Sequence, residues 1–221
     1  MRGRFDEQLD VLHTQMIEMG ALCETAIACA IKGLLEGDAE NATRAIAIDE
    51  EIDRMERDIE TLCLKLLLQQ QPVASDLRKI SSALKMITDM ERIGDQAADI
   101  AEITKLNNVK ASDDTFTIRE MSMAAIHMVT DSIDAYVRQD LELAHAVIAA
   151  DDEVDNYFNE AKAQLAQLLG GNPNRAEYVI DALMIAKYLE RIADHATNIA
   201  EWVVFSITGR HEGENDGHLP G

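Results

Sequence analysis

Residues 91–102 read Glu-Arg-Ile-Gly-Asp-Gln-Ala-Ala-Asp-Ile-Ala-Glu, and residues 190–201 repeat the pattern as Glu-Arg-Ile-Ala-Asp-His-Ala-Thr-Asn-Ile-Ala-Glu. On an α-helix the acids of the first copy fall within about 80° of one another, while Ile93, Ala97 and Ile100 point roughly the other way. Stacked carboxylates repel by roughly 0.2–0.5 kcal/mol per pair. This acidic face is therefore expected to need a counter-charge, either a metal ion or a basic partner.

The composition is typical of packed helices. Hydrophobic residues make up 47% of the 221 residues, aromatic residues only 4%, and the chain contains 3 prolines. Alanine, leucine, isoleucine and methionine supply most of the apolar bulk, which favours helices over β-structure. We therefore predict an all-α protein of one large domain or two small ones.

The charge balance restricts the possible partners. There are 20 basic and 41 acidic residues, which gives a net charge of −21. A surface this acidic repels phosphate backbones, so direct binding of nucleic acid is disfavoured. The same surface favours cations and basic protein surfaces, although solubility alone accounts for much of the excess charge.

The cysteines and the hydropathy pattern predict a cytoplasmic protein. Cys23, Cys29 and Cys63 lack metal-ligand spacing and lie among apolar residues, so we expect buried free thiols in a reducing compartment. The N-terminus does not read as a signal peptide, and no apolar run approaches the ~20 residues that span a bilayer. Membrane association is expected only through partners.

Apolar residues at three- and four-residue spacing predict helices along most of the chain. Turn and capping residues divide these helices at Gly37-Asp38, Pro72, Gln139-Asp140 and Gly170-Gly171-Asn172-Pro173. Residues 107–114 are polar and are expected to form a linker, and residues 209–221 a disordered tail. The expected helices are 5–36, 38–70, 75–106, 115–138, 141–169 and 173–208.

The two halves of the chain form an internal repeat. Asp-Glu-Glu-Ile-Asp at 49–53 matches Asp-Asp-Glu-Val-Asp at 151–155, just as 91–102 matches 190–201. Short connections force neighbouring helices to be antiparallel, so residues 5–106 and 115–208 are each predicted to close as a three-helix bundle. A single larger six-helix bundle is the alternative that the sequence leaves open.

The duplicated Glu-Arg-Ile-x-Asp-x-Ala-x-x-Ile-Ala-Glu, with Asp-x-x-x-Asp on each second helix, resembles the PhoU family over about residues 5–208. PhoU proteins are accessory regulators of bacterial phosphate uptake. The resemblance implies two tandem three-helix bundles, a homodimer, and repression of the phosphate-starvation response when phosphate is plentiful. It also implies a non-enzymatic adaptor between the ATPase subunit of the phosphate ABC transporter and the phosphate-sensing histidine kinase.

Members of this family carry acidic motifs that can bind multinuclear metal clusters at the protein surface, so the resemblance implies two metal sites. The first site would comprise Asp49, Asp53, Glu91, Asp95 and Asp99. The second would comprise Asp151, Asp155, Glu190, Asp194 and Asn198. Carboxylate oxygens suit hard cations such as Mg²⁺, Mn²⁺, Ca²⁺ or iron. Because Asp99 becomes Asn198 and Asp89 becomes Tyr188, the second site is expected to hold a cation less tightly.

Purely structural explanations of the same residues stay open. The acidic faces are solvated surfaces in one reading, with Arg92 and Arg191 pairing with neighbouring acids at little gain in stability. Glu142-x-x-His145 suggests a di-iron motif, but that chemistry needs a second copy, which the first half lacks. No phosphate-binding glycine loop or catalytic triad appears. A metal store or metal-dependent enzyme is the alternative function, and a plain helical scaffold is the third.

Overall fold

The structure, a computed structural model, describes residues 2–69, 72–107 and 116–211, and this part of the chain contains no strand. Its helices, in chain order, are α1 (Arg2–Glu36), α2 (Ala39–Gln69), α3 (Ala74–Asn107), α4 (Phe116–Arg138), α5 (Leu141–Gly171) and α6 (Ala176–Thr208). A 3-10 turn, η2 (Pro173–Arg175), joins α5 to α6. The all-α prediction is confirmed. The predicted linker and tail lie almost wholly outside the described residues.

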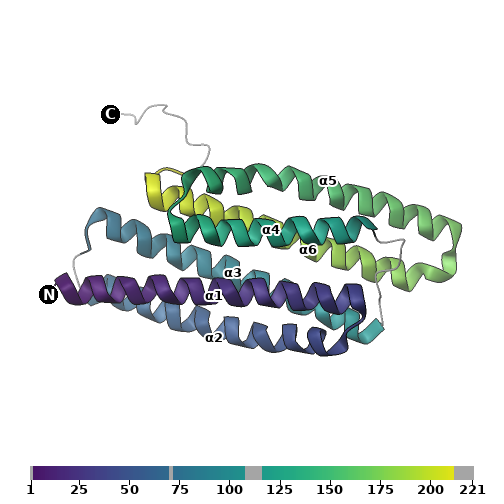
Figure 1. Ribbon diagram of the computed structural model, residues 1–221, viewed down its shortest axis with the longest axis horizontal. Helices are drawn as coiled ribbons and strands as arrows, with labels where there is room; N and C mark the ends of the chain where they lie inside the picture. The colour runs from purple at the N-terminus through teal and green to yellow at the C-terminus, as the bar shows by residue number, and fades with distance from the viewer. Residues whose placement is uncertain (1, 70–71, 108–115, 212–221) are drawn as a thin grey trace.

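Each half of the chain folds as a three-helix bundle. Helices α1, α2 and α3 pack against one another, and α4, α5 and α6 do the same. Figure 1 shows all six helices running along the long axis of the molecule, with the first bundle below the second. The bundles meet where α3 packs against α6 and α1 packs against α4, which leaves α2 and α5 outermost. The prediction of two tandem three-helix bundles is confirmed.

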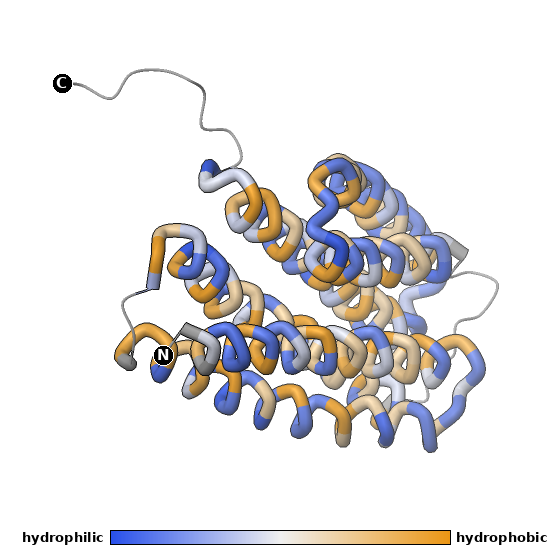
Figure 2. Tube along the Cα trace, turned by 60° about the vertical axis from the view of Figure 1, so that its left-hand side comes forward, coloured by the Kyte–Doolittle hydropathy of each residue, from blue (hydrophilic) through white to orange (hydrophobic). Residues whose placement is uncertain are grey.

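The apolar stripe of each helix supplies the core. Figure 2 shows hydrophobic and hydrophilic positions alternating along every helix, as expected when one side faces a neighbour and the other faces water. Met16, Met19, Ile52, Ile59 and Leu66 are completely buried. Burying a side chain of this size stabilises the fold by roughly 1.5–3 kcal/mol. Packing of these stripes, rather than helix propensity alone, therefore holds the long helices in place.

The cysteines and the apolar character of the helices both follow the sequence pattern. Cys23, Cys29 and Cys63 are buried and make no disulfide, as predicted. Within the described residues, none of the helices combines the length and the apolar character needed to cross a membrane.

The first turn of each bundle is built in the same way. Gly37 and Gln139 both adopt left-handed backbone conformations, with φ of 68° and 52°. The next residue then caps the following helix: Asp38 accepts a hydrogen bond from the backbone N–H of Glu40 at 3.0 Å, and Asp140 accepts one from Leu143 at 3.0 Å. The repeat seen in the sequence therefore extends to the backbone geometry of the turns.

The last break in the chain falls later than the sequence suggested. Helix α5 continues through Gly170 and Gly171 and ends at Asn172, whose backbone N–H donates to the carbonyl of Leu168 at 3.0 Å. A glycine weakens a helix by about 1 kcal/mol but does not stop it. Asn172 precedes Pro173 and has φ −148° and ψ 90°, because the proline ring disfavours the helical conformation there. The proline, rather than the glycine pair, ends the helix.

Gly94 lies where α3 comes close to side chains of α2. A Cβ atom at this position would lie 2.8 Å from Asp49 Oδ1 and 2.9 Å from Ile52 Cδ1. The second half has Ala193 at the equivalent position, and there the residue matching Ile52 is Val154, which lacks the Cδ1 atom. The two bundles therefore fill the same space in two different ways.

We expect the effect of Gly94→Ala to depend on residue 52. With Ile52 present the added methyl group overpacks the α2–α3 contact and lowers the free energy of unfolding by about 1 kcal/mol. With Ile52→Val the clash with the Cδ1 atom is gone and only the carboxylate at the end of the flexible Asp49 side chain must shift, so alanine's helix propensity brings the change close to neutral. Urea unfolding of both single variants and the double variant measures this. Equal effects of Gly94→Ala in both backgrounds would contradict the packing argument.

Candidate functional site: two carboxylate clusters

The structure brings the acids of the first motif together with those of α2. The first cluster consists of Asp49, Asp53 and Glu56 on α2 and of Glu91, Asp95 and Asp99 on α3. Burial, followed by the charges of Asp95 and Asp53, raises the pKa of Asp49 to about 6. Burial and then Asp95 raise the pKa of Glu91 as well. All five residues predicted for the first site thus lie within reach of one another's charge.

Asp49 stands out in the first cluster because its carboxylate is poorly compensated. Its Oδ1 atom is buried and has no hydrogen-bond partner. A carboxylate oxygen without a partner is costly, because it has lost water and gained no donor in return. This atom therefore marks the point in the first cluster where a cation or a proton would be most stabilising.

The second cluster lies between α5 and α6. It contains Asp151, Asp155, Glu190 and Asp194. Partial loss of hydration, then Glu190 and Asp151, raises the pKa of Asp194. Burial raises the pKa of Asp151, although a hydrogen bond from Thr197 works in the other direction. Four of the five residues predicted for the second site therefore influence one another electrostatically.

The two clusters differ in how their charge is compensated. Thr197 donates its hydroxyl to Asp151 Oδ1 at 3.1 Å, so the counterpart of the unpartnered Asp49 oxygen is satisfied. Lys187 pairs with Glu190. In the first cluster Arg92 bridges Glu91 at 3.3 Å and Asp95 at 2.9 Å. The pairing of Arg92 that was considered from the sequence is present, and its 52% exposed side chain limits its contribution to stability.

Asn198 takes a different place from the other predicted ligands. Its Nδ2 donates to Asp89 Oδ1 of α3 at 3.0 Å, and His195 Nδ1 approaches the same oxygen at 2.9 Å. The Asp89 side chain is only 14% exposed. Asn198 is thus bound to the neighbouring bundle instead of lying among the carboxylates of α5 and α6.

A related contact joins Asp99 to the second bundle. The Tyr188 hydroxyl donates to the Asp99 carboxylate and lowers its pKa, against the larger raising effect of burial. Asp89 and Tyr188 occupy equivalent positions of the two motifs, and so do Asp99 and Asn198. From the sequence, these differences indicate only a loss of charge at the second site. The sequence alone gave no signal that the four residues pair with one another across the two bundles.

No group of three or more histidine, cysteine, aspartate or glutamate side chains within residues 2–69, 72–107 and 116–211 is arranged to hold one metal ion. The carboxylates of each cluster interact through their charges, but their side chains are not arranged around a common point. The donor chemistry suits a hard cation. Binding one would require the side chains to turn toward a common point.

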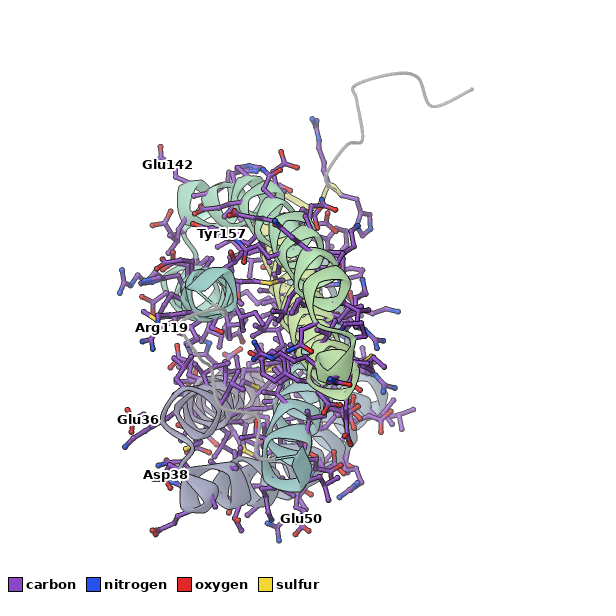
Figure 3. All side chains as sticks on the ribbon, turned by 90° about the vertical axis from the view of Figure 1, so that its right-hand side faces the viewer. Glu36, Asp38, Glu50, Arg119, Glu142 and Tyr157 are labelled. Atoms are coloured by element: carbon purple, nitrogen blue, oxygen red, sulfur yellow. The ribbon has the colours of Figure 1, made fainter. Side chains whose placement is uncertain are left out.

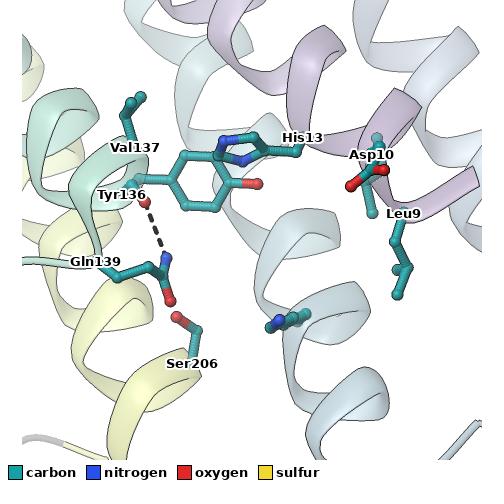
Figure 4. A pocket seen from close by; sticks show the side chains of 9 residues that line it. Leu9, Asp10, His13, Tyr136, Val137, Gln139 and Ser206 are labelled. Carbon is teal, nitrogen blue, oxygen red and sulfur yellow. Dashed lines mark hydrogen bonds between the residues drawn. The ribbon is translucent and has the colours of Figure 1, made fainter. Parts of the chain in front are cut away.

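A separate hollow of about 290 Å³ lies where the two bundles meet, near the turn after α4. Figure 4 shows His13 beside Tyr136, with ring centroids 5.3 Å apart, and the Gln139 side chain donating to the Tyr136 carbonyl at 2.8 Å. Asp10 and Lys79 also line this hollow. Opposite charges beside apolar walls define no single ligand chemistry, so we assign it no role in the site.

A duplicated three-helix bundle with one acidic cluster per copy places the chain in a class of tandem helical-bundle proteins, and comparison with known proteins identifies the family. The family model described as "PhoU domain" matches residues 16–104 and again 118–203. A PhoU homolog from Clostridium acetobutylicum, named a phosphate-specific transport system accessory protein, is 36% identical over 97% of this chain and 99% of its own length. The chain belongs to the PhoU family.

Solved structures agree with this assignment. The crystal structure of PhoU from Pseudomonas aeruginosa matches with a TM-score of 0.90 and 33% identity, covering 93% of this chain and all of that one (100%). The phosphate transport system regulatory protein PhoU from Streptococcus pneumoniae matches with a TM-score of 0.81 and 27% identity, covering 94% of this chain and 98% of that one. The fold and the resemblance stated from the motifs are therefore confirmed.

The raised pKa of Asp49 makes stability depend on pH. The ordinary aspartate value is 3.8 and that of folded Asp49 is about 6, so the folded chain binds this proton more tightly than the unfolded chain. The stabilisation is fully present below about pH 4 and is lost as pH rises through about 6. We therefore expect Asp49→Asn to gain stability relative to the unmodified chain between pH 4 and pH 7, by about 0.5–1 kcal/mol given the screening at a part-exposed site.

Urea unfolding at pH 4, 5.5 and 7 measures this difference. The exposed neighbour Glu50 provides the control, because Glu50→Gln removes one negative charge from the same helix without touching the buried oxygen. A constant difference between Asp49→Asn and the unmodified chain across this range would show that Asp49 titrates normally.

Proposed function

We propose that this chain is a negative regulator of phosphate uptake and of the phosphate-starvation response. The observation that carries the proposal is its likeness, over nearly the full length of both chains, to relatives named phosphate-specific transport system accessory proteins. The names of these relatives describe accessory proteins and no enzymatic reaction. In this proposal the chain acts in the cytoplasm as a non-catalytic homodimer.

The proposed mechanism is that of an adaptor. The chain would bind the ATPase subunit of the phosphate ABC transporter and the phosphate-sensing histidine kinase, and would reach the membrane only through them. Its long helices offer extended surfaces, and its net charge of −21 favours basic patches on both partners. The state of the transporter would then change which partner is bound, because a partner shifts an equilibrium only through a difference in affinity between two states.

Pull-down of the ATPase subunit and of the kinase with the full chain tests this proposal. We expect both to be retained, with retention falling as salt rises, because the steering charges become screened. Deleting the gene should raise expression of phosphate-starvation genes in phosphate-rich medium. Retention of neither partner in either phosphate state, together with unchanged expression on deletion, would overturn the proposal.

A second function, binding of divalent or iron cations, is favoured by the unpartnered Oδ1 atom of Asp49. We propose that the first cluster would hold a cation through Asp49, Asp53 and Asp95, with Glu91 and Asp99 beside them. The second cluster would use Asp151, Asp155, Glu190 and Asp194. A bound cation would supply the positive charge that these rows of carboxylates lack. Its role would be to fix α2 on α3, and α5 on α6, for partner binding.

Titration calorimetry with Mn²⁺ on chelator-treated protein tests cation binding. Because Thr197 and Lys187 already satisfy part of the second cluster, we expect tighter binding at the first one. Asp49→Asn with Asp95→Asn should remove the tighter phase and leave the weaker one, whereas Asp151→Asn with Asp194→Asn should do the reverse. Identical isotherms for all three proteins would show that neither cluster is a cation site.

A further inference from the structure

A groove runs between α4 and α5 on a part of the surface that the acidic clusters do not use. It has a volume of about 360 Å³. Figure 3 looks along the helices and labels Arg119 on α4 and Tyr157 on α5, the two helices that form it. Its apolar lining consists of Ala124, Met128, Ala146, Val147 and Ala150, of which Met128 and Val147 are buried. Small and apolar side chains thus line an open trough between helices α4 and α5.

The internal repeat allows the groove to be compared with the equivalent surface of the first bundle. The turn residues Gly37 and Gln139 are equivalent, so each position of α4 and α5 has a counterpart in α1 and α2. The three alanines of the floor replace larger residues of the first bundle. The pairs are Leu22 and Ala124, Arg44 and Ala146, and Ile48 and Ala150. At other lining positions the second bundle has the larger side chain, as at Met128 against Ala26, so the α4–α5 groove differs in shape from the hollow of about 360 Å³ that lies between α1 and α2.

The rim of the groove is acidic. Glu120 and Asp131 line it from α4 and Glu153 from α5, and the basic side chain among the lining residues is that of His127. The Tyr157 hydroxyl donates to Glu153 Oε1 at 3.2 Å. That hydrogen bond first, then partial burial, and then the charges of Glu153 and Glu120 raise the pKa of Tyr157. A ligand in the groove would therefore meet negative charge on both sides.

The shape of the groove favours a rod over a compact molecule. Ala146 and Tyr157 are three helical turns apart on α5, a distance of about 16 Å. Met123 is 47% exposed at the edge, and Met128 is 3% exposed in the floor. Flexible methionine side chains adapt to the apolar side chains of a helix. Anionic lipid headgroups would be repelled by the rim, which argues against a membrane surface.

We propose that the α4–α5 groove binds an amphipathic, basic helix of a partner protein. Two apolar side chains one helical turn apart would enter the trough over the alanines, and lysines or arginines on either side would face Glu120 and Glu153. This mode is helix-in-groove recognition, in which apolar anchors give affinity and the rim charges give orientation and rate of association. The inference goes beyond the adaptor function, because it depends on the chemistry of the segment and not on which protein carries it.

The test uses the full chain and a fluorescently labelled synthetic helix of about 18 residues, with leucine on one face and lysine on the other. Fluorescence anisotropy gives the Kd. We expect Glu120→Lys with Glu153→Lys to weaken binding about tenfold or more. The matched control is Glu18→Lys with Glu51→Lys, which changes the equivalent exposed positions of the first bundle and gives the same net charge. It should change the Kd by less than about threefold.

A second variant tests the floor without changing any charge. Ala124→Leu with Ala150→Ile introduces the side chains that the first bundle has at the equivalent positions, Leu22 and Ile48, and it should weaken peptide binding about tenfold by filling the trough. Circular dichroism and urea unfolding confirm that the helices persist. If this variant fails to fold, the two charge-reversal pairs still decide the question.

Two results would overturn the proposal. One is equal weakening by the two charge-reversal pairs, which would show that binding follows only the net charge of the chain. The other is an unchanged Kd in the folded floor variant, which would place the peptide elsewhere. Binding of the ATPase subunit and of the kinase is measured separately, by pull-down. Loss of peptide binding therefore rejects the groove proposal alone and does not bear on the adaptor proposal.

Discussion

The antiparallel contact between α3 and α6 is the constraint on which the rest of the structure depends. It brings the two copies of the acidic motif together at the centre of the molecule and leaves α2 and α5 on the outside. Asp89 of α3 binds Asn198 of α6, and Asp99 of α3 binds Tyr188 of α6. Asp89 and Tyr188 hold one motif position, and Asp99 and Asn198 hold the other. Each position of α3 therefore pairs with the other position of α6, as a two-fold relation between the bundles requires. Had both copies kept aspartate at both positions, like charges would face each other within hydrogen-bond distance.

This constraint explains why the clusters are unequal. The residues that diverged between the copies serve the contact between bundles, so the second cluster loses a carboxylate for a structural reason. The first cluster keeps an unpartnered oxygen on Asp49, whereas Thr197 satisfies the matching oxygen of Asp151. The same divergence appears in packing, where Gly94 and Ile52 of one bundle become Ala193 and Val154 in the other. A duplicated fold thus carries one strongly charged cluster and one that is largely compensated.

Much of this could be predicted from the sequence, because helical periodicity, capping residues and an internal repeat are local signals. Asp38 and Asp140 cap helices as their positions suggested, and the acids of residues 49–53 and 91–99 do share a face. The contact of Asn198 with Asp89 could not be predicted, since pairing across bundles depends on the crossing of α3 and α6 and leaves no pattern within either helix. The glycine pair predicts an earlier end for α5 than the structure has, because glycine weakens a helix without stopping it. The groove between α4 and α5 has no sequence signal of its own, since alanines on two amphipathic helices are typical of ordinary core.

The most direct test of the account is a double-mutant cycle between Asp89 and Asn198, measured by urea unfolding at pH 7. Asn198→Asp alone should destabilise the chain by about 1 kcal/mol, because two carboxylates then meet at the contact between bundles. Adding Asp89→Asn removes that repulsion, so the double variant should recover most of the loss, with a coupling energy of about 1 kcal/mol. Additive effects of the two changes would mean that α3 and α6 do not meet at these residues, and the central contact of the fold would be wrong.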